Sequence, residues 1–424
     1  MIRAVNEAMS EAALPHAPVP GQGSLRDVWL ITLGHSLTHW YPATFYLLLP
    51  IIGNELGLSF SQIGFIMSCQ YIAGAVANVP GGVIVDTVGR KGLLMAISLF
   101  WVGFPYLLMS FTHSYVMLIL CVVMVGVGNS LWHPTAIPTL AQTYPQRKGF
   151  VLSLHGMGGN AGDAIAPLVV GALLAVFTWR EVVVLNVLPG IVVSLLLLVF
   201  LGSLQLGRKK AAGTATESTS QNLASYVDGL KVLLRNRSLL LLSTSGAFRS
   251  MTQNALLTFL PLFLAREMGY SPWHTGLAMA LLQVAGLMAA PVAGHLSDQL
   301  GRRSVTLGTM AMTALVLLLM AFMGPSHVFV FFIALLGFFL YALRPVLQAW
   351  LLDTTPKSMG GSSVGILFGA QSLGSSVAPL IGGWIADSQG LAATFYFLAF
   401  TIVCANVLIM FMPKVDAAPQ RLGA

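Results

Sequence analysis

The chain has 424 residues, of which 56% are hydrophobic and only 8% are charged, and its mean hydropathy is +0.82. A soluble domain carries about 25% charged residues, so this composition excludes a soluble enzyme and a disordered chain and indicates an integral membrane protein. The net charge of +7 leaves a nucleic-acid partner open until the positions of the basic residues are considered.

The chain begins with a polar tail, residues 1–27, which lacks the apolar core of a signal peptide. A polar linker at 205–237 separates a first six-helix bundle at 28–204 from a second at 238–413, and a short tail follows at 414–424. A spanning helix needs about 20 mostly apolar residues, which predicts an all-α membrane protein with twelve transmembrane helices in two pseudo-symmetric bundles. The expected spans are approximately 28–50, 60–84, 92–112, 115–141, 150–176, 182–204, 238–264, 273–297, 303–323, 327–352, 362–386 and 391–413.

The basic residues lie mostly on one side of these spans. With both termini inside, 17 of the 21 lysines and arginines fall in inner segments and only Arg180 and Arg266 in outer ones, while two lie within helices. Cytoplasmic loops carry the excess of lysine and arginine. The sequence therefore predicts a multi-pass protein of the cell inner membrane with cytoplasmic termini, in contact with the lipid bilayer and with no nucleic-acid partner.

The two halves repeat each other at an offset of 212 residues. The pattern G-x3-D-x2-G-R-[KR] follows the second expected helix at 82–91 and the eighth at 294–303. Parallel duplication of a six-helix unit is characteristic of transporters. Further matches at this offset are Gly64 with Gly276, Gly162 with Gly374, Pro167 with Pro379 and Gly171 with Gly383.

Twelve helices in two halves, with this pattern in both corresponding loops, resemble the major facilitator superfamily over residues 25–415. The resemblance implies a central cavity lined by helices 1, 4, 7 and 10. We expect the loop residues to latch the two halves, and a purely topogenic role for the arginines is the alternative. The glycines of each loop permit a tight turn, and each aspartate can cap the next helix or pair with the arginine. The predicted latch comprises Gly82, Asp86, Gly89, Arg90, Gly294, Asp298, Gly301 and Arg302.

A closer resemblance is confined to the first half. The run 132–134 (Trp-His-Pro), the run 147–149 (Arg-Lys-Gly) and the run 153–162 resemble the fosmidomycin-resistance type of efflux protein. Thr135 stands where that group has a glutamate, so the substrate of that group is not carried over. The resemblance nevertheless favours efflux and a role in drug resistance.

Ionisable residues within the expected helices are candidates for function, because each costs at least about 2.5–3.5 kcal/mol at a helix centre. Asp163 is the one carboxylate near the middle of an expected helix, and a carboxylate that gains and loses a proton suits proton coupling. A structural ion pair with arginine or histidine, or a place on the cavity wall, remains an alternative. The predicted proton-coupling residues are Asp163, His35, His39, His133 and His155.

Arg249 and Arg344 lie within the expected seventh and tenth helices and stay charged at any relevant pH. Two such cations can clamp a carboxylate or phosphonate group, whereas pairing with Asp163 or with helix-end carbonyls is the alternative. The predicted substrate-binding residues are His39, His133, Arg249, Gln253, Asn254, Arg344 and Gln348.

His35 and His39 have the i, i+4 spacing of a zinc pair, but no glutamate follows His35 and no third ligand is obvious in the sequence. We therefore expect no metal and no cofactor. No Walker motif occurs, so a proton gradient rather than ATP is the expected driving force. The glycine runs on the fifth and eleventh helices favour close helix packing over an antiport-specific role; they are Gly158, Gly159, Gly162, Gly369 and Gly374.

Together these features predict a monomeric secondary transporter, not an enzyme, that moves a small organic solute by alternating access. Proton-coupled efflux by antiport is favoured by Asp163, by the histidines and by the efflux resemblance. Proton-coupled uptake of an anionic metabolite is the first alternative, because of the two arginines. A membrane-embedded metalloenzyme that uses His35, His39 and His133 is the second.

Overall fold

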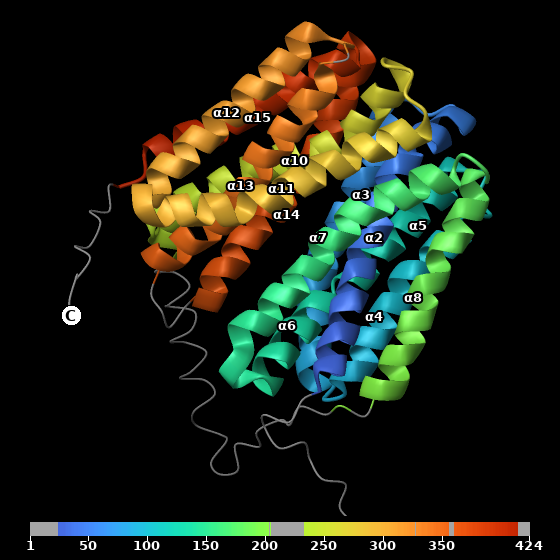
Figure 1. Ribbon diagram of the computed structural model, residues 1–424, viewed down its shortest axis with the longest axis vertical. Helices are drawn as coiled ribbons and strands as arrows, with labels where there is room; N and C mark the ends of the chain where they lie inside the picture. Colours follow the sequence, from blue (N-terminus) through green and yellow to red (C-terminus); the bar gives the residue numbers. More distant parts are fainter. Residues whose placement is uncertain (1–23, 203, 205–232, 327, 356–359, 414–424) are drawn as a thin grey trace, which may run out of the picture.

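The structure, a computed structural model, describes residues 24–202, 204, 233–326, 328–355 and 360–413. They form helices joined by short connections (Figure 1). The first half contains α2 (Leu25–Glu55), α3 (Phe60–Thr87), α4 (Lys91–Met109), α5 (Tyr115–Asn129), α6 (Trp132–Thr143), the 3₁₀ helix η1 (Pro145–Arg147), α7 (Lys148–Leu173) and α8 (Trp179–Leu201). The second half contains α10 (Arg237–Arg266), α11 (Pro272–Leu300), α12 (Arg302–Met323), α13 (Phe329–Thr354), α14 (Gly360–Gln389) and α15 (Leu391–Met410).

Nine spans in the described part of the chain are long and apolar enough to cross a membrane. The helices α2, α7 and α10 are not among them, although they contain 31, 26 and 30 residues. At 1.5 Å per residue they extend roughly 39–47 Å, more than the hydrocarbon layer requires. They are less apolar because they hold the polar residues predicted for the site. The all-helical membrane fold is thus confirmed, and twelve crossings are consistent with it.

The fourth expected span is broken, contrary to the prediction of one helix over 115–141. Its two pieces, α5 and α6, are separated by a turn at Ser130 and Leu131. Pro134 has no N–H to donate to the Ser130 carbonyl, and its ring crowds that carbonyl. The Ser130 hydroxyl also bonds to the Val127 carbonyl, at 2.7 Å. The corresponding Pro345 leaves α13 continuous.

The two bundles lie side by side in Figure 1 and meet along two helix pairs, α3 with α14 and α7 with α11. The repeat places the same residue types at both contacts. A Cβ atom on Gly64 would lie 2.1 Å from the Pro379 carbonyl oxygen, and one on Gly276 would lie 2.2 Å from that of Pro167. Only glycine allows backbones to approach this closely. The glycine–proline matches at offset 212 are therefore the contacts between the halves.

All these contacts lie at one end of the molecule, formed by the starts of α3 and α11 and the ends of α7 and α14. Toward the opposite end Gly156 on α7, Gly294 on α11 and Gly369 on α14 make no such contact, since a Cβ atom on each would meet nothing within 4 Å. The halves are therefore closed at the end formed by the outer connections and apart at the end that holds the repeated loops. Gly369 was predicted to pack closely, and this prediction is wrong.

Replacing Gly383 with alanine is expected to open the closed end. Its Cβ atom would lie 2.5 Å from the Phe60 carbonyl oxygen and 2.8 Å from the Ser61 Cα atom. Forcing backbone apart costs about 1–3 kcal/mol, which shifts the balance of conformations about 5- to 100-fold. Labelling of a cysteine at Leu257 with an impermeant maleimide measures the shift. Gly369→Ala on the same helix is the control, and equal labelling of both variants would contradict the prediction.

Candidate functional site

Four histidines from three helices of the first half meet in one cluster. His35 and His39 lie on α2, His133 on α6 and His155 on α7. The Nδ1 atom of His35 lies 2.6 Å from the His155 carbonyl oxygen, and its Nε2 atom lies 3.1 Å from Nε2 of His133. The rings of His35 and His155 stack with their centroids 3.8 Å apart. The predicted histidines are thus neighbours, which their separation in the sequence does not require.

The hydrogen-bond partners in this cluster determine which ring nitrogen of each histidine carries a hydrogen. A carbonyl oxygen only accepts hydrogen bonds, so the neutral His35 ring carries its hydrogen on Nδ1 and donates it to the His155 carbonyl. The Nε2 atom of His35 then presents a lone pair, and His133 donates its own Nε2 hydrogen to it. One ring on α2 is thereby oriented by both α6 and α7.

Asp163 on α7 pairs with His39 on α2. The Nδ1 atom of His39 donates to Oδ2 of Asp163 at 2.9 Å, and the two side chains are 25% and 26% exposed. In the described part of the chain no ion pair joins Asp163 to an arginine. The sequence left open whether Asp163 pairs with an arginine or a histidine, and in the structure its partner is a histidine. Both side chains of the pair are partly accessible.

The glycines of α7 let this helix approach α2. A Cβ atom on Gly162 would lie 2.1 Å from the Ser36 carbonyl oxygen, and one on Gly158 would lie 2.5 Å from that of Thr32. A Cβ atom on Gly159 would lie 2.8 Å from Cε1 of His35 and 3.0 Å from Nε2 of His39. Close packing is confirmed for these three glycines, and Gly159 in particular leaves room for the histidine rings.

The second half contributes two arginines. Arg249 on α10 is 3% exposed; it donates to the Gln253 side chain at 2.9 Å and to the Leu340 carbonyl at 3.4 Å. Leu340 lies in the middle of α13, so this carbonyl is not the helix-end partner of the alternative. Arg344 on α13 is exposed, and it lies within electrostatic range of both Arg249 and His133. Because His133 belongs to the other half, the Arg344 side chain lies at the space between the halves.

Asn254 holds the halves together rather than standing free. Its carbonyl oxygen accepts a hydrogen bond from the Tyr71 hydroxyl at 2.9 Å, and its amide group donates to Ser375 at 2.6 Å. Tyr71 in turn is hydrogen-bonded to the Tyr46 hydroxyl. This chain of hydrogen bonds crosses from α2 and α3 to α10 and α14, and its tyrosines were not among the residues predicted from the sequence. The last predicted substrate residue, Gln348, is half-buried on α13.

A small cavity lies beside Asp163 and is lined by residues of both halves. Its volume is about 40 Å³, and Asp163, Gln253, Gln283 and Tyr46 are among its lining residues, so a water molecule fits. Gln253 is also the hydrogen-bond partner of Arg249. The carboxylate of the first half and both guanidinium groups of the second half are all within electrostatic range of Tyr341.

Three histidines of the cluster could hold a metal ion. Ligand atoms of His35, His39 and His133 all lie within 4.8 Å of one another, and His35 is buried while the other two are half-buried. The sequence shows the spacing of a metal-ligand pair only on α2, and His133 joined that pair only in the metalloenzyme alternative. The third ligand comes from α6, which the fold brings next to that pair.

The repeated loops lie at the open end, and the described contacts of the second loop stay within its own half. Arg302 pairs with Asp298 at 2.5 Å and with Asp353 at 3.3 Å. Gly301 has φ of +87°, as a tight turn demands, whereas Gly89 is not among the glycines with positive φ. Gly89 still lies in the short connection between α3, which ends at Thr87, and α4, which begins at Lys91. Arg90 is exposed, Gly294 has no close neighbour, and the side chains at Gly82 and Asp86 lie outside the described residues.

Removing the Asp298 carboxylate is expected to favour the conformation described here, because a latch between the loops can stabilise the molecule only when this end is closed. An exposed ion pair contributes up to about 1 kcal/mol, so Asp298→Ala should change the labelling of a cavity cysteine up to about fivefold. Asp353→Ala, which removes the other partner of Arg302, is the matched variant. Unchanged labelling and transport in Asp298→Ala would leave only the topogenic role.

Asp387 is a contact between the halves that the sequence reasoning missed. Its two carboxylate oxygens accept hydrogen bonds from the backbone N–H groups of Phe60 and Ser61, both at 2.8 Å. A carboxylate at a helix N-terminus is favourable, so α14 caps α3 across the interface. The repeat contains a signal for this asymmetry. At offset 212, Ala175 corresponds to Asp387, and Pro272, which has no N–H, corresponds to Phe60.

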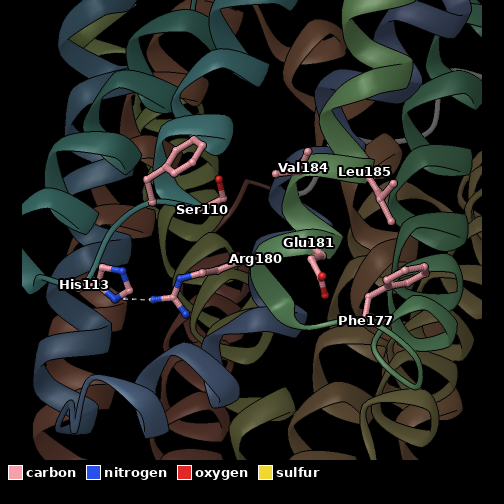
Figure 2. Close-up of a pocket in the computed structure, with 8 residues that line it drawn as sticks. Ser110, His113, Phe177, Arg180, Glu181, Val184 and Leu185 are labelled. Atoms are coloured by element: carbon pink, nitrogen blue, oxygen red, sulfur yellow. Dashed lines mark hydrogen bonds between the residues drawn. The ribbon is translucent and has the colours of Figure 1, made fainter.

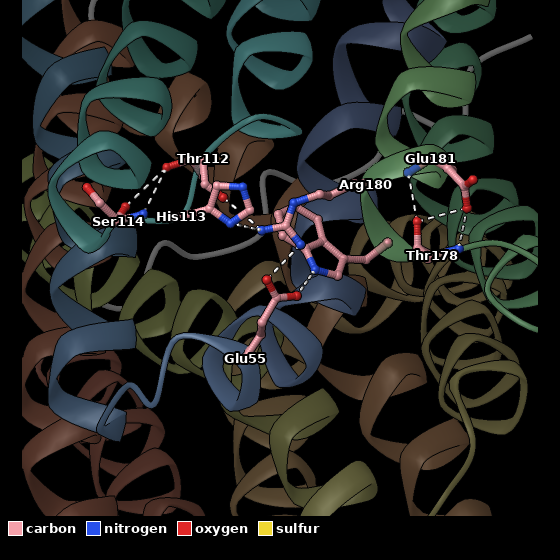
Figure 3. A network of polar contacts seen from close by, with 8 residues as sticks. Glu55, Thr112, His113, Ser114, Thr178, Arg180 and Glu181 are labelled. Atoms are coloured by element: carbon pink, nitrogen blue, oxygen red, sulfur yellow. Dashed lines mark hydrogen bonds and ion pairs between the residues drawn. The ribbon is translucent and has the colours of Figure 1, made fainter.

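A further groove lies at the closed end and on the first half only. It measures about 570 Å³ and is lined by the α4–α5 connection and the start of α8 (Figure 2). Figure 3 shows that Arg180 pairs there with Glu55 at 2.6 Å and donates to the Thr112 carbonyl at 2.9 Å. These contacts tie the ends of α2, α4 and α8 together. The groove does not lie between the halves, so it is not the transport pathway.

Comparison with known proteins gives one family over nearly the whole chain. The model of the Major Facilitator Superfamily matches residues 28–287 and 242–423. The Fosmidomycin resistance protein of Escherichia coli is 23% identical over 96% of this chain and 98% of that protein. The Phosphoglycerate transporter protein of Salmonella typhimurium is 23% identical over 91% and 88%. The Probable sulfoacetate transporter of Cupriavidus necator is 26% identical over 88% and 91%.

Solved structures agree on the fold. The inward-facing, occupied structure of a bacterial homologue of the human lysosomal transporter Spinster has a TM-score of 0.76 and covers 92% of this chain and 97% of its own. Its sequence identity is 18%, so the likeness concerns the fold alone. Both expected resemblances, to the superfamily and to the fosmidomycin-resistance type, are confirmed.

Proposed function

Because the chain belongs to the major facilitator superfamily, and is therefore a transporter of small molecules rather than an enzyme, we propose that it carries a small organic anion together with a proton. It acts as a monomer in the cell inner membrane, with both termini in the cytoplasm, so that the open end of the structure faces the cytoplasm. This proposal rests on the charged side chains around the space between the two halves, which is called the central region below.

Two guanidinium groups face this region, against one carboxylate. Within the described residues the hydrogen-bond partners of the buried Arg249 are neutral, and Arg344 stands at the space between the halves. Asp163 is bonded to His39 and not to an arginine. In the described part of the chain Arg249 and Arg344 are thus left without an ion-pair partner, and a bound anion supplies the counter-charge. The relatives named for phosphoglycerate and sulfoacetate, both organic anions, support this substrate class.

The pair of Asp163 and His39 is the proposed site of the proton. Without an added proton the pair carries one negative charge, which repels an anion in the same region. A proton added to the pair makes it neutral and removes this repulsion. Each ligand therefore helps the other to bind, and such coupling is reciprocal. This electrostatic argument favours symport over antiport. Symport corresponds to proton-coupled uptake of an anion, the first alternative from the sequence.

Alternating access uses the contacts already described. The glycine–proline contacts and Asp387 hold the present closed end, and the repeated loops lie where the other end would close. The two halves then rock about the central region and expose it to each side in turn.

Proton-driven export by antiport is the second candidate. It is supported by the similarity to the Fosmidomycin resistance protein of Escherichia coli and to the Multidrug resistance protein of Escherichia fergusonii, 24% identical over 88% of this chain and 91% of that protein. In this mechanism the solute and the proton compete, which suits a solute that displaces the proton from Asp163.

The sign of a pH change separates these candidates. Purified protein is placed in liposomes that enclose a pH-sensitive dye, and an anion selected by thermal shift from phosphoglycerate, sulfoacetate and hexuronate is added outside. Symport acidifies the lumen as the anion enters, whereas antiport makes it alkaline. An anion-dependent rise in lumen pH would overturn the proposed symport. Binding of cationic solutes alone would overturn the proposal that the substrate is an anion.

A further inference from the structure

We propose that His35, His39 and His133 form a binding site for one divalent transition-metal ion such as Zn²⁺ or Co²⁺. This inference goes beyond the proposed function and does not depend on it, because metal binding at equilibrium can be measured without transport. The three side chains converge from α2 and α6, and their ligand atoms lie within 4.8 Å of one another. Imidazole nitrogen suits zinc, cobalt and nickel.

The distances are close to those of a metal site. Zinc–nitrogen bonds of about 2.0–2.1 Å in a tetrahedral site place neighbouring ligand atoms roughly 3.3 Å apart. The Nε2 atoms of His35 and His133 are already 3.1 Å apart. The ring of His39 must shift modestly, and as a half-buried side chain it has room to do so. Three protein ligands leave a fourth position for water or a solute.

The other ring nitrogens have the partners that metal-binding histidines need. The Nδ1 atom of His35 donates to the His155 carbonyl, and Nδ1 of His39 donates to Asp163. A metal-bound histidine almost always donates its second N–H to a carboxylate or backbone carbonyl, which fixes the ring and directs the first nitrogen to the ion. The carboxylate also supplies negative charge near a dication. In both rings Nε2 is therefore the nitrogen that binds the metal. His133, which donates its Nε2 hydrogen to His35 in the absence of metal, then carries its hydrogen on Nδ1.

Two further observations describe the packing of the cluster. The rings of His35 and His39 pack directly against Gly159, where a Cβ atom would lie 2.8 Å from Cε1 of His35 and 3.0 Å from Nε2 of His39. His155 is 3% exposed, yet neither of its ring nitrogens has a hydrogen-bond partner in the described part of the chain. A buried polar group without a partner calls for an ion or a water molecule nearby. The half-buried His39 and His133 provide the route of entry.

The test is metal binding by purified, tag-free full-length protein in detergent, after removal of metals with a chelator. We expect one Zn²⁺ per chain by calorimetry, and a visible ligand-field spectrum of tetrahedral type with Co²⁺. His35→Ala, His39→Ala and His133→Ala should each lower the affinity by at least about 100-fold, and Asp163→Asn by about 10- to 100-fold. His274→Ala and His295→Ala, which change exposed histidines outside the cluster, are the controls.

A second pair of variants distinguishes loss of the metal site from misfolding. Gly159→Ala should weaken binding because its Cβ atom displaces both rings, whereas Gly156→Ala on the same helix should not, since it meets nothing within 4 Å. Thermal unfolding without metal checks that each variant is folded, and Zn²⁺ should raise the unfolding temperature only where the site is intact. Equal binding by wild type and by the triple histidine variant, or no binding by folded wild type, would overturn the proposal. In the latter case water occupies the cluster.

Discussion

Asp163→Asn is expected to abolish accumulation of solute driven by a pH gradient while leaving folded protein in the membrane. Asparagine has nearly the shape of aspartate, and its carbonyl oxygen can still accept the hydrogen bond that His39 donates at 2.9 Å. What the variant loses is the negative charge and the ability to take up a proton. The interface of α2 and α7 is therefore preserved, and any loss of coupling is due to the loss of the group that binds the proton.

Two flux measurements in liposomes separate coupling from transport. The variant should still carry solute down its own gradient, but without movement of protons and without accumulation against a gradient. Asp27→Asn is the control, because that carboxylate is paired with its neighbour Arg26 in the first turn of α2. Full gradient-driven accumulation by Asp163→Asn would remove Asp163 from the mechanism.

The second large effect concerns the charge of the substrate. Arg344→Ala should weaken the binding of an anionic solute by about 10- to 100-fold, since a hydrogen bond to a charged group contributes about 1.5–3 kcal/mol. Arg344→Lys keeps the charge but not the fork of donors. A small residual loss in the lysine variant indicates a point charge, and a large one indicates that the guanidinium group binds the anion with two hydrogen bonds.

Arg344 is a cleaner position for this experiment than Arg249. Arg344 is exposed, whereas truncation of Arg249 would leave Gln253 and the Leu340 carbonyl without their buried partner and cost stability as well. Arg237→Ala, at the exposed start of α10, is the control for a general loss of positive charge. Isothermal titration with charged and neutral solutes measures all variants, and equal affinities throughout would exclude the anion clamp.

The membrane fold, the positions of the helices and the duplication could be predicted from the sequence. These features are local or periodic: a span needs a run of apolar residues, and a repeat needs only a constant offset. The same offset even marked the contacts between the halves, because the match of Gly64 with Gly276 and of Pro167 with Pro379 reflects two equivalent places where backbones touch. The sequence did not indicate that these residues touch each other.

The site depended on tertiary structure. Side chains that are about 100 residues apart in the chain, such as His35 and His133, meet only because helix packing places α6 beside α2, and no spacing rule encodes such a contact. For the same reason the partner of Asp163, the third potential metal ligand and the cap that Asp387 forms on α3 were decided by the fold. The sequence determined which residues are costly in a membrane, since that depends on residue type and on the span that holds them. The tertiary structure decided which of them compensate one another.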